Sequence, residues 1–373
     1  MKNIFLSLTM VLLVGNLFAQ SSVNNSEIFI DTITTFQLYS DEDLNPIQLF
    51  PKATDQNYTM GFGFGISSLR YKSWFIFAPV TKLDNWILGK NTTQGLNTIV
   101  LPPSISLNGT AFTPDDLRST EPITNDRPYA FLLALSTKRG YIDSERDMVF
   151  RSELNIGAFG LNIGKWVQTK IHEHANENDT KPPYTPRGWH NQIANGFAPA
   201  FLYALSLGKR VVDLPSQKQN RSYFDMKIGT GGSVGYYTQV NGFASLRLGL
   251  LDSRNWIQEF NPLGNMSKRI TDNNSGRQLG EIYVFASAQP TFMAYNAMLN
   301  GTIWRNSVHT LNWNQTNHLI LEWTTGISAH IPFKNTKRSL DVTWAVNAGR
   351  TSELKTELER THYWGGVYLG YSW

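Results

Sequence analysis

The chain has 373 residues and a formal net charge of +4; 17% of its residues are charged and 13% are aromatic. This small charge, without a dense cluster of Lys or Arg, gives no indication of nucleic-acid binding. The absence of cysteine excludes disulfides, thiol chemistry and cysteine–zinc sites. A soluble enzyme of this length would usually carry more charge, so the composition favours a membrane barrel with aromatic belts.

Residues 1–20 are predicted to be a secretory signal peptide. Lys2 supplies the positive start, Ile4 to Val14 the apolar run, and Phe18 to Gln20 a processing site. The apolar run is too short for a membrane anchor. Since no other segment approaches about 18 consecutive apolar residues, we expect no membrane helices in the mature chain, 21–373.

Apolar and polar side chains alternate in several segments of the mature chain. Between Tyr58 and Ser68, Met, Phe or Ile alternates with Thr, Gly or Ser. Similar alternation marks 150–158, 318–331, 340–349 and the C-terminal segment 362–373, which ends on an aromatic residue. Successive side chains of a strand point to opposite faces, so each segment has one apolar and one more polar face. A soluble sandwich also alternates, but long strands with repeated charges on the polar face favour a barrel with lipid outside and a polar lumen.

The predicted fold is all-β: a transmembrane antiparallel β-barrel of about twelve strands, with both termini in the periplasm. We expect long extracellular loops at 41–56, 80–126 and 161–196. Segment 252–278 is also long and polar, yet strict counting places it on the periplasmic side. The predicted strands are 30–40, 57–68, 71–79, 127–138, 147–160, 197–208, 222–232, 234–250, 279–290, 317–332, 338–349 and 362–373. Four inward charged residues are expected to plug this barrel with their side chains: Arg151, Glu153, Glu322 and His330.

Polar clusters fall at the predicted outward ends of strands. They comprise residues 41–43, 54–59, 124–130, 167–173 and 187–192. Strand direction alone predicts that all five lie at the cell-exterior end of the barrel. The first cluster, Asp-Glu-Asp, is the densest group of carboxylates there, and calcium prefers such oxygen ligands. A solvated acidic turn would equally explain its second and third residues.

Residues 163–176 break the period of two. Ile163, Val167 and Ile171 recur every four residues, which predicts a short helix lying against the barrel wall. Gln168 and His172 are also four apart and share an adjacent face. A histidine can transfer protons near neutral pH because its unperturbed pKa is about 6.5. His172 is therefore a candidate general base, and the alternative is an ordinary solvated loop histidine.

Taken together, these motifs resemble the outer-membrane lipid A 3'-O-deacylase family, LpxR. The resemblance rests on Asp41, Asp55 to Gly61, Asn125 to Ala130, Gln168 to His172 and Gly188 to Gln192, in this order. It extends over nearly the whole mature chain. It implies a twelve-stranded barrel whose site lies between the wall and a helix from an outward loop. It also implies calcium-dependent hydrolysis of the ester that attaches the 3'-linked acyloxyacyl group to lipid A.

The resemblance also implies roles for particular residues. His172 would be the base that activates water, and Asp41 would help hold a calcium ion that stabilises the oxyanion. Thr59 matches the family's hydroxyl residue entering the second strand. Asp126 and Arg127 match an Asp-Arg pair that we expect to orient the site or the substrate's phosphate. The other predicted substrate-binding or orienting residues are Gln168, Trp189 and Asn191. A serine acyl-enzyme lacks its usual Gly-x-Ser-x-Gly signature in this chain.

Three positions depart from the family pattern. Ser40 stands where relatives carry Asn, Thr124 where some carry Lys, and His190 where Asp is common. The candidate histidine and acid remain in place.

Three functions remain open at this stage. The first is a calcium-dependent outer-membrane esterase resembling lipid A 3'-O-deacylase, whose partners would be the outer membrane and the lipid A of lipopolysaccharide. The second is an outer-membrane phospholipase-type esterase, and the third is a non-catalytic envelope barrel. Calcium near Asp41 within reach of His172 would favour the first. Placement of the two residues on opposite sides of the barrel would favour the third. No obligate protein partner and no nucleic acid are expected.

Overall fold

The computed structural model describes residues 33–42, 57–94, 98–143, 145–175, 185–218, 220–257, 279–334 and 336–373. For residues 42, 57, 58, 91, 92, 171, 172, 174 and 175 the description covers the backbone alone. The predicted signal peptide, Asp43 and Asp55 lie outside the described residues.

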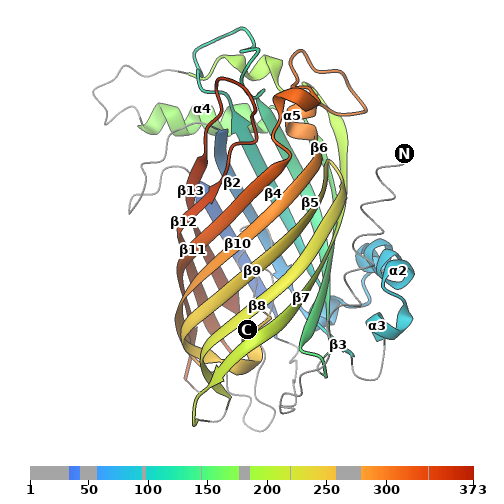
Figure 1. Ribbon diagram of the computed structural model, residues 1–373, viewed down its shortest axis with the longest axis vertical. Coiled ribbons are helices and arrows are strands. Elements are labelled where there is room, and N and C mark those ends of the chain that lie inside the picture. Colours follow the sequence, from blue (N-terminus) through green and yellow to red (C-terminus); the bar gives the residue numbers. More distant parts are fainter. Residues whose placement is uncertain are drawn as a thin grey trace.

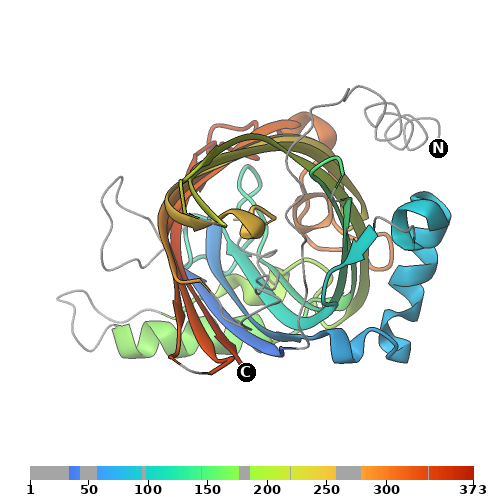
Figure 2. The same ribbon diagram turned by 90° about the horizontal axis from the view of Figure 1, so that it is seen from below.

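The described strands form one antiparallel sheet in the order β3-β5-β4-β2-β1-β13-β12-β11-β10-β9-β8-β7-β6, and pairing of β5 with β6 closes it into a barrel (Figures 1 and 2). Because β3 and β4 both pair with β5, they form one interrupted strand and the wall has twelve strands, as predicted. The strands are β1 Thr35–Glu42, β2 Asn57–Ser67, β3 Thr98–Val100, β4 Ser104–Thr113, β5 Ala130–Asp143, β6 Met148–Phe159, β7 Ala198–Pro215, β8 Arg221–Gly235, β9 Tyr237–Asp252, β10 Glu281–Asn296, β11 Leu319–Pro332, β12 Ser339–Arg350 and β13 His362–Ser372.

Short helices lie at the ends and on the outside of this wall. Helix α4 lies at one end of the barrel, whereas α2 and α3 lie outside it, beside the half farther from α4 (Figures 1 and 2). None of the described helices has the length and apolar character needed to cross a membrane. The helical elements are η1 Leu69–Tyr71, η2 Phe75–Phe77, α2 Ala78–Ile87, α3 Lys90–Gln94, α4 Ile163–Ala175, η4 Gly188–Asn191, η5 Ser253–Asn255, α5 Ala297–Asn300 and η6 Trp313–Gln315.

The alternation predicted from sequence separates the two faces of the wall. On β1, Phe36 and Leu38 are exposed on the outer face, while Thr35, Tyr39 and Asp41 are buried on the inner face. On β13 the odd positions from 367 to 371 face outward, and the even positions are the more buried. The outer surface is thus apolar, as lipid contact requires.

One predicted strand and one predicted loop were wrong. Residues 71–79 form η2 and the beginning of α2, and the missing strand lies inside the predicted loop 80–126, as β3 and β4. Pro79 falls in the first turn of α2, where its missing N–H is tolerated. On β4 the outward positions include Gly109 and Ala111, so its alternation is weak in the sequence. Only the stretch from residue 114 onward joins the loops at the α4 end.

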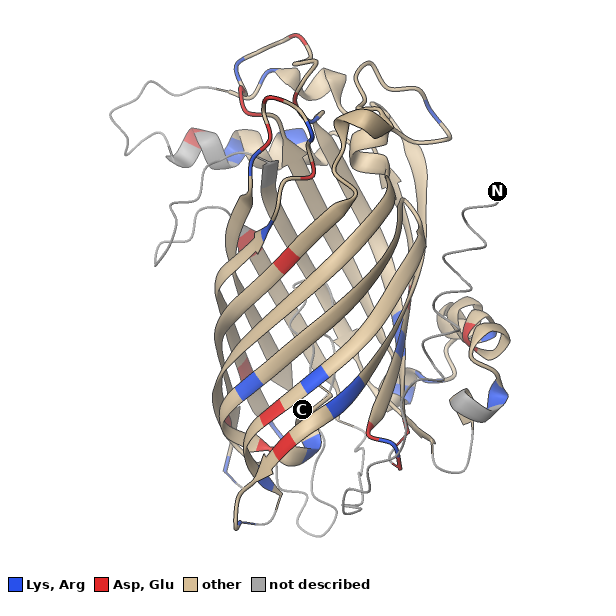
Figure 3. Cartoon of the chain, in the orientation of Figure 1, with Lys and Arg blue, Asp and Glu red and all other residues tan. Residues whose placement is uncertain are grey.

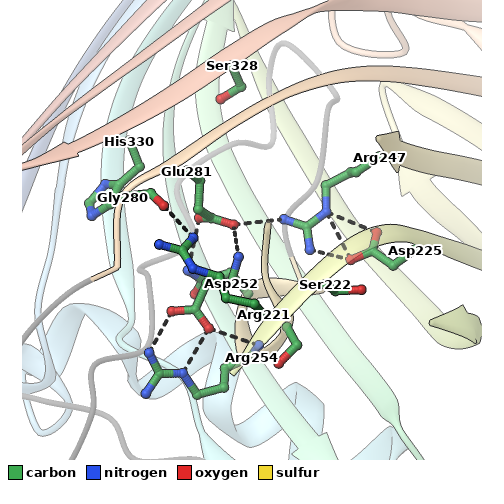
Figure 4. A network of polar contacts seen from close by, with 12 residues as sticks. Arg221, Ser222, Asp225, Arg247, Asp252, Arg254, Gly280, Glu281, Ser328 and His330 are labelled. Carbon is green, nitrogen blue, oxygen red and sulfur yellow. Dashed lines mark hydrogen bonds and ion pairs between the residues drawn. The ribbon is translucent and has the colours of Figure 1, made fainter. Parts of the chain in front are cut away.

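Charged side chains inside the barrel pair with one another. At the end opposite α4, Arg247 binds Asp225 and its Nη1 lies 3.7 Å from Glu281, while Arg254 binds Asp252 at 2.6 Å (Figure 4). Of the predicted inward residues, Glu153 pairs with Lys138 and Glu322 with Arg350. His330 Nδ1 lies 2.9 Å from Asp341 Oδ1, and Arg151 donates to the backbone carbonyl of Ile257. A lumen cavity of about 300 Å³ remains, lined by residues such as Tyr236 and Gln239. The lumen is therefore polar and partly filled.

Candidate functional site

Helix α4 packs against the outer face of the barrel wall at strands β2, β4 and β5. Met60, Ala111 and Phe131 project outward from these strands into a buried cluster with Leu117, Tyr129 and Trp189, and Val167 of α4 packs on it. We call this set the α4 contact cluster. A Cβ added to Gly164 would lie 2.8 Å from the Phe131 ring, so this glycine permits the close approach of helix and wall. The predicted placement of the helix against the wall is thus what the structure shows.

A buried hydrogen bond joins α4 to the loop that follows it. Trp189 Nε1 of η4 donates to Gln168 Oε1 of α4 at 2.7 Å, and both side chains are 1% exposed. The Trp189 ring also lies 4.9 Å from the Tyr129 ring. Buried indole N–H groups usually find such a partner. Gln168 Nε2 is buried and has no hydrogen-bond partner among the described residues. The carbonyl oxygen of the Gln168 side chain therefore anchors Trp189, and through it the loop, to α4.

His172 lies on α4, one turn after Gln168. Its side chain lies outside the described residues. A further histidine of the predicted loop 161–196, His190 of η4, is exposed, and its Nδ1 lies 3.1 Å from the Arg187 carbonyl.

Asp41 lies on the inner face of β1, which is the opposite face of the wall from α4. It is fully buried and accepts a hydrogen bond from the Tyr368 hydroxyl of β13. Its strand neighbours are Gly61 and Gly366, and a Cβ at Gly366 would collide with the Asp41 carboxylate. The prediction that all the clusters share one end of the barrel agrees with the topology. The described side chains do not bring Asp41 to the α4 side of the wall.

Thr59 occupies an irregularity at the start of β2. The β2–β4 register shifts between Tyr58 and Met60, and the Thr59 hydroxyl lies 2.7 Å from that of Thr113. Bulges re-aim side chains and are frequent beside active sites. Thr59 is next in sequence to Met60, which belongs to the α4 contact cluster.

Asp126 and Arg127 are almost fully buried and hold loops together. Asp126 accepts hydrogen bonds from the backbone N–H groups of Asp115 and Arg127, at 2.6 and 2.7 Å, and pairs with Arg360 at 2.8 Å. Arg127 pairs with Glu353 at 3.1 Å. At 0% and 1% exposure, neither side chain can reach a substrate phosphate in this conformation. Their arrangement favours the orienting role.

The Arg127–Glu353 pair sits beneath the loops at the α4 end. Burial raises the pKa of Glu353, but Arg350 and Arg127 outweigh it, so the pKa lies below its usual range. The pKa of Arg127 is lowered, mainly by burial and also by the positive charge of Arg360. The carboxylate of Glu353 raises this pKa but does not outweigh the burial. Asn191 adds a further link by donating to the Thr120 carbonyl at 2.7 Å. These contacts bind loop 114–129 to 351–361 and to η4.

Comparison with known proteins identifies the family. A family model described as "Outer membrane protein LpxR" matches residues 4–373. The chain belongs to the LpxR family. Among solved structures, LpxR from Salmonella typhimurium matches with a TM-score of 0.63 and 15% identity, over 90% of this chain and 99% of that one. Its fold is therefore the fold of this chain, an outer-membrane β-barrel.

Other solved barrels are more distant. The β domain of the Bordetella autotransporter BrkA has a TM-score of 0.38 and 9% identity, covering 92% of this chain and 99% of that one. The translocator domain of NalP from Neisseria meningitidis has a TM-score of 0.32 and 10% identity, covering 91% of this chain and 86% of that one. A comparison with curated protein sequences gives no match.

The described residues of this LpxR family member do not by themselves form a calcium site. Calcium takes six to eight oxygen ligands, and the described part of the chain contains no group of three or more His, Asp or Glu side chains arranged to hold a metal ion. Asp41 offers one carboxylate, whereas Asp43 and the Glu42 side chain lie outside the described residues. The donor set that the structure shows is therefore incomplete for this ion.

Some residues of the site gave no recognisable signal in the sequence. Glu353 and Arg360 pair with Arg127 and Asp126 across more than 220 positions of the chain. Tyr368 reaches Asp41 only because β13 closes the barrel against β1. The charges of Glu353 and Arg360 could mark them as candidates in the sequence. Which residues they contact, however, depends on the order of the strands in the barrel.

Proposed function

We propose that this LpxR family protein is an outer-membrane hydrolase that removes the 3'-linked acyloxyacyl group of lipid A. Family membership over nearly the whole chain supports a deacylase-like activity. The observation that carries the proposal is the position of α4, which bears His172 and packs on the outer, apolar face of the wall. A lipid in the outer leaflet would reach that helix laterally, without entering the lumen.

The proposed reaction is ester hydrolysis with water as nucleophile. His172 takes a proton from water as its oxygen bonds to the acyl carbon, and returns a proton to the sugar oxygen when the ester C–O bond breaks. The products are the free acid and a 3'-hydroxyl. The role of His172 rests on the family resemblance.

Calcium dependence is part of the proposal on the strength of the resemblance alone. A bound cation would supply positive charge to the oxyanion. Because the described residues supply too few oxygen ligands for calcium, no step of the reaction is assigned to the ion. A chelator titration tests this part separately: loss of activity that calcium restores is expected, and full activity in excess chelator would remove calcium from the account.

A non-catalytic barrel is the second candidate, and the placement of Asp41 favours it. Asp41 faces the lumen while α4 lies outside, so the two predicted contributors to one site are separated by the wall. In the lipid A reading, Asp41 would stabilise the ends of β1 and β13 rather than touch the substrate. Activity retained in Asp41→Asn but lost in His172→Ala would support that assignment.

Parallel digestions separate the candidate functions. Purified protein is incubated with lipid A or with glycerophospholipid vesicles, each with calcium, and the products are measured by mass spectrometry. The proposal predicts loss of the 3'-acyloxyacyl group from lipid A and little phospholipid cleavage. Preferential phospholipid cleavage would favour the phospholipase-type reading, and no product from either substrate would favour the non-catalytic barrel.

A further inference from the structure

A carboxylate fixes helix α2 to the outside of the barrel. Asp84 of α2 is fully buried and accepts hydrogen bonds from the Tyr141 hydroxyl at 2.6 Å and the Tyr203 hydroxyl at 2.9 Å. These tyrosines belong to β5 and β7, so α2 spans the wall across β6. Phe77 and Val80 are buried on the same side of the segment as Asp84.

The outward residues beneath α2 differ from those farther along the same strands. Elsewhere on the same strands the outward residues are apolar, such as Leu135, Ile156 and Phe201. Under α2 the outward positions carry the hydroxyls of Tyr141 and Tyr203. Both hydroxyls donate to Asp84, so α2 is fixed to the wall by two buried hydrogen bonds.

The opposite face of this segment is exposed and combines aromatic with cationic side chains. Trp74, Phe75 and Trp86 are 50%, 89% and 76% exposed. Residues 69–94 contain four basic residues and one acidic residue, Asp84, which is turned inward. The basic residues, all exposed, are Arg70, Lys72, Lys82 and Lys90. Figure 3 shows blue segments along these helices outside the barrel.

Such a surface matches a membrane interface in chemistry and position. Aromatic side chains favour the headgroup level, and lysines beside them attract anionic lipids. The segment lies beside the half of the barrel farther from α4, toward the end where β1 begins and β13 ends (Figure 1). In an outer-membrane barrel with an even strand number both termini are periplasmic, so this half is embedded in the inner, phospholipid leaflet.

We propose that residues 69–94 form an interfacial binding site for anionic phospholipids of the inner leaflet. The aromatic side chains insert among the acyl chains near the headgroups, and the lysines bind the headgroup phosphates. This role is independent of the lipid A reaction, because α2 and α4 lie toward opposite ends of the barrel.

Lipid retention tests the cationic part of the proposal. Protein is assembled in nanodiscs of phosphatidylcholine mixed with phosphatidylglycerol, extracted gently, and its bound lipids are counted by native mass spectrometry. The variant Lys72→Gln, Lys82→Gln, Lys90→Gln is expected to bind phosphatidylglycerol about a hundredfold more weakly and to retain correspondingly less of it, since each of the three lysines near an anionic surface contributes about fivefold.

The matched control removes three exposed lysines from turns at the same end of the barrel: Lys218→Gln, Lys334→Gln, Lys337→Gln. It should retain phosphatidylglycerol as the wild type does. Equal retention by both triple variants would overturn the proposal. Heat-modifiable migration in gels establishes that each variant is folded.

The depth of a fluorescent probe in the membrane tests whether the aromatic side chains insert. Because the sequence has no cysteine, a single introduced cysteine can be labelled specifically. Trp86→Cys and, as control, exposed Asn306→Cys at the α4 end are labelled with an environment-sensitive fluorophore in nanodiscs. Lipids with quenchers near the headgroup should quench the probe at position 86 and leave that at 306 bright. A probe at 86 that is as accessible to an aqueous quencher as the probe at 306 would contradict membrane insertion.

Discussion

Two helices, α4 and α2, pack on the outside of the same wall but are held by different chemistry. An amide–indole hydrogen bond and an apolar cluster hold α4. A buried carboxylate that accepts from two tyrosines holds α2. Gln168 Nε2 is buried without a partner among the described residues, whereas both carboxylate oxygens of Asp84 accept hydrogen bonds. The polar contact that holds α2 is therefore the more completely satisfied of the two.

The largest expected effect is on the rate of lipid A deacylation and comes from replacing His172 of α4. Replacing His172 with Ala should lower lipid A deacylation by about a hundred- to ten-thousand-fold, the usual contribution of a general base, without changing stability. His190→Ala is the control, because that exposed histidine lies in the same loop. Equal activity of the two variants would remove His172 from the mechanism.

The second prediction concerns stability rather than rate. Asp84→Ala leaves two tyrosine hydroxyls without their acceptor and should lower the free energy of unfolding by about 2 kcal/mol or more. Urea unfolding in lipid measures this, with Glu121→Ala, an exposed acid at the other end, as control. Deacylation should be unchanged when both variants are assayed below the unfolding range. A rate loss matching that of His172→Ala would show that the two helices are not separable.

The third prediction weakens α4 without removing its histidine. Trp189→Phe keeps a ring beside Tyr129 but loses the bond to Gln168, which should cost about 1 kcal/mol. Hydrogen exchange should rise in α4 and not in α2, and activity should fall several-fold. Unchanged exchange in α4 would mean that the apolar cluster alone fixes the helix.

The smallest effect is a pH dependence of the loops at the α4 end. Because the folded pKa of Glu353 lies below its unfolded value, its pairing stabilises the loops above about pH 4.3 and is lost as pH falls through the folded pKa. The protection factors of the amides in 114–129 and 351–361, which correct for the intrinsic pH dependence of exchange, should therefore fall at acidic pH. In Glu353→Gln the exchange should be high already at neutral pH, and an unaltered neutral-pH exchange in that variant would contradict the role of the pair.

The sequence predicted those parts of the molecule that depend on local periodicity. The barrel class and the α4 helix follow from spacings of two and four residues. The count of twelve strands is correct because the false strand 71–79 offsets the missed strand formed by β3 and β4. The segment 71–79 was misassigned because Trp74 to Phe77 supply apolar side chains in either conformation, and Pro79 fits a first helical turn. The strand β4 was missed because its outward Gly109 and Ala111 give little contrast.

The site was predicted less completely because its contacts depend on closure of the barrel. Gln168 and Trp189 were named as separate candidates, and only the fold shows that they bond to each other. Whether Asp41 faces in or out depends on one residue of register, since a shift of one reverses the face. Sequence motifs could therefore place it at the correct end of the barrel without placing it on the α4 side.

The most direct test of the central claim is the mass of lipid A after incubation with wild-type, His172→Ala and His190→Ala protein in one membrane preparation. The account predicts that the 3'-acyloxyacyl group disappears with the wild type and His190→Ala and stays with His172→Ala. Intact lipid A in all three reactions, with folded barrels verified in each, would contradict it.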